Sequence, residues 1–255
     1  MGKRPTRRRY VPPFETDELR KSLSGFFDAP YTDDDTGETK PIGSFKWGVY
    51  IFYDYDGEPI YVGQTKERVS GCIGRHLTNQ RTDAVAMSVL DPFEVCEIEV
   101  YPLPQFEDVK SKLPDGKKNP AFKHAKDYLD ALENFVHAKA IKDSDYDAIL
   151  NEKDPPEPKL QINAPKPLRG RIVSDEVFKL RSHADVRIAR RAQIVARLAQ
   201  TISERQVQNG LRRTLITQAR RIQRLAEDRF RELGGAATVE QGAEGEGEEA
   251  EEAEE

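Results

Sequence analysis

Two tyrosines in the first third of the chain have the type and spacing needed to share one site. Residues 47–53 and 58–63 are rich in aromatic and β-branched side chains, which favours strands, and the residues between them are typical of a turn. A tight hairpin would place Tyr50 opposite Tyr61, and opposed residues project from the same face. The two phenols would then lie side by side. With a pKa of about 10, a phenol is a poor base unless a metal or a cation lowers that pKa.

The residues around these tyrosines form a paired motif. Gly48-Val49-Tyr50 is followed, after ten residues, by Tyr61-Val62-Gly63 and then by Gln64-Thr65. This pattern resembles the motif that names the GIY-YIG nuclease superfamily. Ile73-Gly74-Arg75-His76-Leu77 resembles the first helix of that family. Glu133 and Asn151 follow in the order in which the family carries a helical glutamate and a later asparagine.

The resemblance covers about residues 46–153 and implies a metal-dependent DNA endonuclease. In the family, the hairpin tyrosines and a helix residue, here His76, surround the attacking water. Glu133 would hold one Mg²⁺ or Mn²⁺, whose remaining ligands would be water. The metal would polarise the phosphate and stabilise the leaving oxygen. Taken alone, each of these residues would be an ordinary strand or helix side chain, so the site rests on their combination.

Two points separate the alternatives within this resemblance. Asn151 would either support the metal site without binding the metal directly or contact the backbone, and Asn163 is an alternative candidate for this position. The family usually carries an arginine four residues before the helix histidine, where this chain has Cys72. Either Arg75, our first choice, or Arg68 supplies the missing charge, or the domain is a catalytically weakened DNA-binding or assembly subunit.

We expect the site to lie in a compact α/β unit, of the α+β type, over residues 44–164. A small three-stranded antiparallel sheet would be flanked by helices. Its third strand is predicted from the alternation in 93–101. Helices are predicted within 70–80 and over 83–90. A longer helix would be capped by Asn119, with Pro120 at its first position and an apolar stripe at helical spacing.

Three further regions surround this unit. Residues 1–43 form a basic N-terminal arm with a short predicted helix at 16–27. Residues 165–235 follow a proline-rich linker and form a basic helical or coiled-coil region. Residues 236–255 carry nine glutamates and no basic residue, and we expect this acidic tail to be disordered. Removing these nine charges from the net charge of −5 leaves +4 on the rest of the chain.

The helical region combines an apolar seam with many arginines. The seam follows heptad spacing, and its phase breaks near 206–210, so the region is either one long dimeric coiled coil or a hairpin packed on the nuclease. Between Asp185 and Glu232 twelve arginines are opposed by three acidic residues, which favours contact with phosphate. We therefore expect the region to form a homodimer or to pack on DNA. The seam residues are Ile188, Ala192, Val195, Ala199 and Ile202.

Composition narrows the function classes. No run of about 18 apolar residues exists, so we expect no membrane span. The first residues lack the apolar stretch of a signal peptide. The two cysteines are too few for a disulfide framework and lack zinc-ligand spacing, so we expect a cytoplasmic protein. The expected partner is DNA, and an RNA-directed enzyme stays open. Within the superfamily, restriction-type endonucleases are closest, since no repair or mobile-element domain is recognisable.

Overall fold

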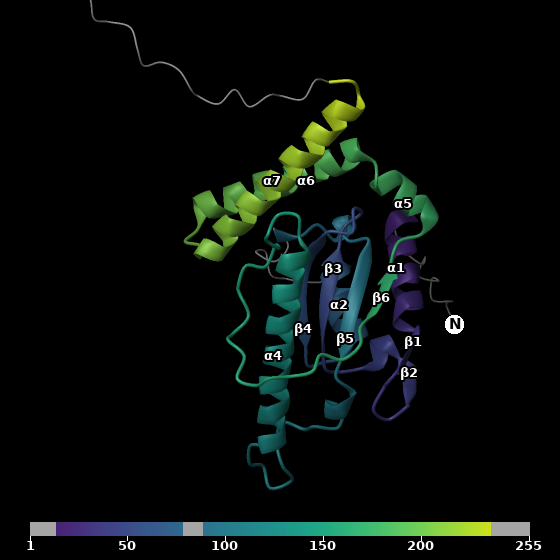
Figure 1. Ribbon diagram of the computed structural model, residues 1–255, viewed down its shortest axis with the longest axis vertical. Coiled ribbons are helices and arrows are strands. Elements are labelled where there is room, and N and C mark those ends of the chain that lie inside the picture. Colours follow the sequence, from purple (N-terminus) through teal and green to yellow (C-terminus); the bar gives the residue numbers. More distant parts are fainter. Residues whose placement is uncertain (1–13, 79–88, 236–255) are drawn as a thin grey trace, which may run out of the picture.

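The computed structural model describes residues 14–78 and 89–235, and its centre is a four-stranded antiparallel sheet. The strand order is β4-β3-β5-β6 (Figure 1). The expectation of three strands is wrong by one, because β6 lies in the segment that the sequence assigned to the helical region. This strand is short, follows two prolines and lacks an apolar alternation. The strands are β3 (Gly48–Tyr53), β4 (Pro59–Thr65), β5 (Glu97–Pro102) and β6 (Leu168–Arg171).

The hairpin of β3 and β4 pairs its residues two positions away from the predicted register. Tyr50 lies opposite Gly63, and Phe52 lies opposite Tyr61. The predicted pairing of Tyr50 with Tyr61 is therefore wrong. A shift of two residues leaves each side chain on its original face, because side chains alternate with a period of two. Tyr50 and Tyr61 consequently still share one face, as diagonal neighbours with ring centroids 6.4 Å apart.

The turn explains this shift. The backbone N–H groups of Asp56 and Glu58 donate to the Asp54 carboxylate, at 2.9 and 3.1 Å. Gly57 has a positive φ of 79°, which a glycine adopts without strain. The loop therefore contains Tyr55, Asp56 and Gly57, where the sequence suggested a tight two-residue turn, and the ladder is irregular beside it.

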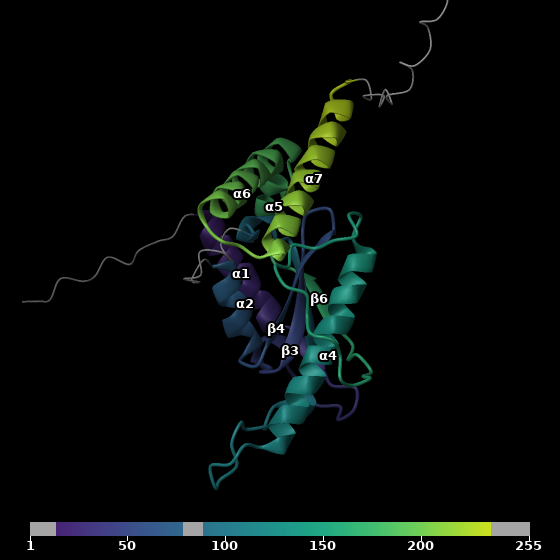
Figure 2. The same ribbon diagram turned by 90° about the vertical axis from the view of Figure 1, so that its left-hand side faces the viewer.

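The two faces of the sheet carry separate hydrophobic cores. Val49, Ile51 and Val62 face α4 (Pro120–Asp143), with which they share one core. Tyr50 and Phe52 point to the other face and pack with α1 (Phe14–Phe27), α2 (Val69–Leu77) and residues from the C-terminal helices. Figures 1 and 2 show α4 on one side of the sheet and α1 and α2 on the other. Tyr50, the first tyrosine of the motif, thus points away from α4 and can form a pocket with α2.

Helix α4 follows its sequence signals closely. Asn119 accepts a hydrogen bond from the Ala121 N–H at 3.0 Å, and Pro120 occupies the first helical position. The predicted cap is therefore confirmed. Leu129, Leu132 and the rest of the apolar stripe from Ala125 to Val136 are buried against the sheet. This packing fixes which side chains of α4 face the sheet and which reach its edge.

Several shorter elements surround the sheet and α4. They are α1 (Phe14–Phe27), β1 (Pro30–Thr32), β2 (Thr39–Pro41), η1 (Ile42–Ser44), α2 (Val69–Leu77), η2 (Pro92–Glu94), η3 (Pro104–Phe106) and α5 (Asp175–Arg181).

The helix predicted over 83–90 lies almost wholly outside the described residues, as do residues 1–13 and the acidic tail. No helix in the described ranges has both the length and the apolar character needed to cross a membrane.

The C-terminal helices form a hairpin packed on the sheet unit. Helices α6 (Ala184–Glu204) and α7 (Asn209–Glu232) lie against each other (Figure 2). The Arg229 guanidinium near the end of α7 pairs with Asp185 at the start of α6, so the two helices run antiparallel. The phase break in the sequence is the connection between them. Of the two arrangements left open by the sequence, the chain folds as the hairpin.

The buried face of α6 differs from the predicted heptad seam. Ala192 and Ala199 of that seam are exposed, whereas Arg187, Arg191 and Leu198 are buried. The Asp54 carboxylate of the β3–β4 turn accepts hydrogen bonds from three arginines, and Arg191 also pairs with Glu94 at 2.8 Å. These arginines are Arg187, Arg191 and Arg221, the last on α7. A hydrophobic pattern cannot reveal a helix face whose centre consists of neutralised charges.

Candidate active site

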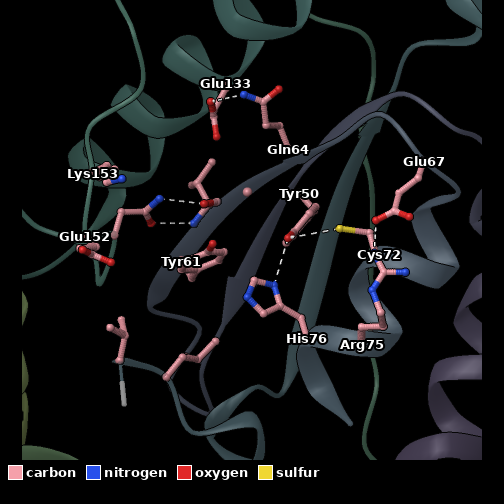
Figure 3. Close-up of a pocket in the computed structure, with 15 residues that line it drawn as sticks. Tyr50, Tyr61, Gln64, Glu67, Cys72, Arg75, His76, Glu133, Glu152 and Lys153 are labelled. Carbon is pink, nitrogen blue, oxygen red and sulfur yellow. Dashed lines mark hydrogen bonds and ion pairs between the residues drawn. The ribbon is translucent and has the colours of Figure 1, made fainter. Parts of the chain in front are cut away.

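All six residues predicted for the site line one pocket of about 460 Å³. The pocket lies between the β3–β4 hairpin, α2, the side of α4 and the segment that follows α4. Figure 3 shows side chains from these elements pointing toward a common space. The pocket is lined by Tyr50, Tyr61, Arg75, His76, Glu133 and Asn151, and also by Val62, Gly63, Gln64, Glu67, Cys72, Val89, Leu90, Glu152 and Lys153.

Tyr50, Tyr61 and His76 form an aromatic cluster at the centre. The Tyr50 hydroxyl lies 3.0 Å from His76 Nδ1, which is hydrogen-bonding distance. The Tyr61 ring lies edge-on to the imidazole, with centroids 5.0 Å apart. The Cys72 sulfur is 3.9 Å from the Tyr50 hydroxyl. Helix α2 thus brings the imidazole to a phenol of the hairpin, an arrangement in which a proton can pass between the two groups.

The glycines of the motif allow this arrangement sterically. A Cβ on Gly63 would lie 2.5 Å from the Tyr50 ring, so only a glycine lets that ring cross β4. A Cβ on Gly48 would lie 2.8 Å from the backbone oxygen of Tyr101 on the neighbouring strand. Both positions therefore require glycine, because other atoms approach the backbone closely there. Gly63 leaves the space that the ring of the catalytic candidate Tyr50 occupies.

Glu133 projects from α4 into the same pocket. Its carboxylate accepts a hydrogen bond from Gln64 Nε2 at 2.9 Å, and the same amide also donates to Asp130 at 3.2 Å. Burial raises the pKa of Glu133 to about 7, and the nearby Asp130 carboxylate adds to this effect. Within the described ranges Glu133 forms no ion pair with a cationic side chain. A buried carboxylate of this kind is stabilised when a cation binds to it.

The donor atoms around Glu133 fit a hydrated Mg²⁺ or Mn²⁺. Gln64 Oε1 is buried and has no hydrogen-bond partner among the described residues, although it is Nε2 of the same amide that contacts the Glu133 carboxylate. The described part of the chain contains no group of three or more histidine, cysteine or acidic side chains placed to hold a metal. Mg²⁺ is often held by only one or two carboxylates with water completing its coordination. These residues therefore fit such an ion, and they do not form a closed structural metal site.

Asn151 is placed in the pocket wall by hydrogen bonds to strand β4. Its side-chain oxygen accepts from the Val62 N–H at 3.0 Å, and its side-chain N–H donates to the Val62 oxygen at 2.8 Å. The amide thereby pairs with β4 next to Tyr61, which suits a positioning role. The rival Asn163 is exposed, and it lies in a different groove beside Phe135.

The pocket also separates the two candidates for the missing arginine. Arg75 lines the pocket and pairs with the Glu67 carboxylate, whereas Arg68 precedes α2 and is absent from the lining. Sequence reasoning missed four polar residues of the wall: Gln64, Glu67, Glu152 and Lys153. Gln64 could have been found from its place directly after the motif. Glu152 and Lys153 carry no signal beyond their position after Asn151.

The arginines of α6 and α7 are largely neutralised by the protein itself. At least eight of the twelve pair with carboxylates, and most of these carboxylates come from outside the two helices. The acidic residues between Asp185 and Glu232 are thus only part of the counter-charge, and less positive charge is available to phosphate than that stretch of sequence implies. The eight are Arg187, Arg190, Arg191, Arg213, Arg221, Arg224, Arg229 and Arg231.

Comparison with known proteins agrees with this geometry. Residues 46–106 match the family model described as the GIY-YIG catalytic domain. The match spans β3, β4, α2 and β5, and hence the tyrosine motif and His76, whereas Glu133 and Asn151 lie beyond it. Comparisons with curated proteins and with solved structures gave no match. The tyrosine pair, the helix histidine and the family match agree, and residues 46–106 of the chain therefore form a domain of the GIY-YIG nuclease superfamily.

Proposed function

We propose that this pocket hydrolyses phosphodiester bonds of DNA with the help of one divalent metal ion bound at Glu133. The observation that carries the proposal is the convergence of Tyr50, Tyr61, His76 and Glu133 on one pocket, although Glu133 lies outside the family match. Hydrolysis requires an activated water and positive charge around the phosphate. The aromatic cluster supplies the first requirement, and the carboxylate with its metal supplies the second.

The hydrogen bond between Tyr50 and His76 suggests how the water loses its proton. The Tyr50 hydroxyl donates to His76 Nδ1 when the imidazole is neutral and carries its proton on Nε2. The phenol oxygen then accepts a hydrogen bond from the attacking water. As the water attacks phosphorus, its proton moves to Tyr50 Oη and the phenol proton moves to His76. The imidazole thus acts as the base, which overcomes the weak basicity of a phenol. Tyr61 closes the other side of the water.

Negative charge that develops on the phosphate would be balanced from two directions. Glu133 would hold a divalent metal ion, which when bound would polarise the phosphate and stabilise the leaving oxygen. Arg75 supplies a guanidinium on the opposite wall and replaces the arginine that Cys72 displaces. Its ion pair with Glu67 is formed by one nitrogen, so other N–H groups of the fork stay available for a phosphate oxygen.

A second candidate function is DNA binding without cleavage. The observation in its favour is Cys72, whose thiol lies 3.9 Å from the Tyr50 hydroxyl at the position where the family carries an arginine. A thiol provides no positive charge for a phosphate. In this case the pocket would bind DNA, and the protein would not cleave it even when Mg²⁺ or Mn²⁺ is present.

Cleavage of supercoiled plasmid in Mg²⁺, Mn²⁺ or EDTA tests the first function against the second. We expect metal-dependent nicking or linearisation by the wild type, and a loss of about 10²–10³ in rate for Tyr61→Phe and for Glu133→Gln, by analogy with loss of one transition-state contact. Glu157→Gln, which removes an exposed carboxylate outside the pocket, is the matched control. A ladder of discrete fragments would support a restriction-type enzyme. No cleavage in either metal would favour the binding function.

A further inference from the structure

The chain segment after Asn151 forms one wall of the pocket and is fixed at both ends. At one end, Asn151 pairs with the backbone of Val62, as described above. At the other end, the Arg213 guanidinium of α7 grips both oxygens of Asp154, at 2.8 and 3.2 Å. Glu152 and Lys153, the two residues between these anchors, are the ones that line the pocket.

Helix α7 also touches this segment through its backbone. A Cβ on Gly210, near the start of α7, would lie only 1.6 Å from the Glu152 carbonyl oxygen. No side chain fits in that space, so the glycine lets the helix rest directly on the segment. Leu211, the next residue, is buried in the core that includes Tyr50. The C-terminal hairpin is therefore part of the pocket's support, although the family match ends far before it.

The charge of Lys153 is left available by this arrangement. Within residues 14–78 and 89–235, Lys153 forms no ion pair, and its side chain is exposed. The carboxylate adjacent to it in sequence, Asp154, is occupied by Arg213. In Figure 3, Lys153 and Arg75 lie on opposite sides of the aromatic cluster. Glu152 lies in the same wall and opposes any anion there.

We propose that Lys153 binds a backbone phosphate of DNA next to the scissile one, and that Arg213 keeps Lys153 available for this phosphate by neutralising the adjacent Asp154 carboxylate. The proposal rests on the proposed function, since it assumes that the pocket receives DNA. A strand that crosses the pocket between Arg75 and Lys153 presents further phosphates beside the one that is cut. Lys153 binds one of these, and because it contacts phosphate only, it adds affinity without sequence preference.

The first test is the salt dependence of DNA binding. Affinity for a labelled duplex is measured by fluorescence anisotropy, in EDTA and in the Glu133→Gln background, so that cleavage plays no part. Loss of one phosphate contact should reduce the slope of log affinity against log salt by about 0.9. Lys153→Ala should therefore bind about eightfold more weakly in 0.1 M salt and almost equally near 1 M salt. Lys153→Arg should retain the wild-type slope. Lys179→Ala, an exposed lysine of α5 outside the pocket, is the control.

The second test separates neutralisation of Asp154 by Arg213 from simple structural support. Arg213→Ala frees the Asp154 carboxylate, which then competes with DNA for Lys153, so the slope should fall as it does in Lys153→Ala. Asp154→Asn added to Arg213→Ala removes the competitor and should restore the slope. A purely structural role of the Arg213–Asp154 pair predicts no such rescue, because the double variant lacks the ion pair altogether.

Kinetically, Lys153→Ala should raise KM and leave kcat unchanged.

The outcomes distinguish this proposal from the proposed function. A wild type that cleaves DNA, with equal salt slopes for Lys153→Ala and Lys179→Ala, overturns the role of Lys153 alone. A wild type that never cleaves, with the expected loss of slope, overturns the nuclease function and supports Lys153 as a phosphate contact. A wild type that does not bind DNA contradicts both.

Discussion

Replacing Glu133 by glutamine should make the metal-free protein more stable, by an amount that depends on pH. Burial raises the pKa of Glu133 from 4.5 to about 7. A carboxyl whose folded pKa lies above its unfolded pKa favours folding when protonated. Its contribution is complete below the unfolded value and is lost as the pH rises through about 7. Above that pH the folded protein contains a costly buried carboxylate, which Glu133→Gln removes.

The size of the effect follows from the shift. Each unit of pKa difference corresponds to about 1.36 kcal/mol, so ionised Glu133 costs the fold about 3 kcal/mol at pH 8 and less than about 1 kcal/mol at pH 5. The difference in unfolding free energy between Glu133→Gln and wild type should therefore grow by about 2 kcal/mol between the two pH values. Any constant effect of the new amide on packing cancels in this comparison.

Urea unfolding in EDTA at pH 5 and pH 8, on wild type and variant, measures this quantity. Glu157→Gln is the control for loss of an exposed carboxylate, and we expect it to follow wild type at both pH values. At pH 8, Mg²⁺ at 100 times its dissociation constant should add about 2.7 kcal/mol to wild type and almost nothing to Glu133→Gln. A difference between variant and wild type that does not change with pH would falsify the argument from burial.

Four further substitutions test other parts of the structure. Asp54→Asn removes the carboxylate that three buried arginines share, and should lower the unfolding free energy by about 3–5 kcal/mol in urea. Gly210→Ala places a Cβ against the Glu152 carbonyl and should cost about 1–3 kcal/mol in the same assay. Arg75→Ala should slow plasmid cleavage by about 10²–10³ with little loss of stability, and Cys72→Arg should add little. Full activity of Arg75→Ala would mean that another group supplies this charge.

The features that the sequence predicted are those set by local patterns. The order of the tyrosine motif, His76 and Glu133 was enough to anticipate one shared pocket. Even the wrong hairpin register kept Tyr50 and Tyr61 on one face, because an even shift preserves the alternation of side chains. The cap of α4 was readable because Asn119 and Pro120 act within one helical turn.

The features that escaped prediction depend on partners far apart in the chain. Strand β6 is defined by its pairing with β5, including an ion pair between Arg169 and Glu97 at 2.6 Å, and its own four residues carry little pattern. The buried arginines of α6 are neutralised by Asp54, more than 130 positions earlier. Hydropathy assigns an arginine to the surface until its counter-charge is located. Within the described part of the chain, Lys153 likewise stands out as an unpaired cation only once Arg213 of α7 is seen to pair with the adjacent Asp154.

The pairing of Asn151 with β4 also protects the protein from its own sheet edge. Strand β4 is the last strand on its side of the sheet, and an unpaired edge invites strands of other molecules to add to it. Here the Leu150 N–H donates to the Ile60 oxygen at 2.8 Å, and the Asn151 amide occupies both backbone groups of Val62. The domain thus covers this edge with a short segment instead of another strand. Asn151→Ala would expose the backbone N–H and C=O of Val62, so we expect this variant to self-associate more strongly than wild type at high protein concentration.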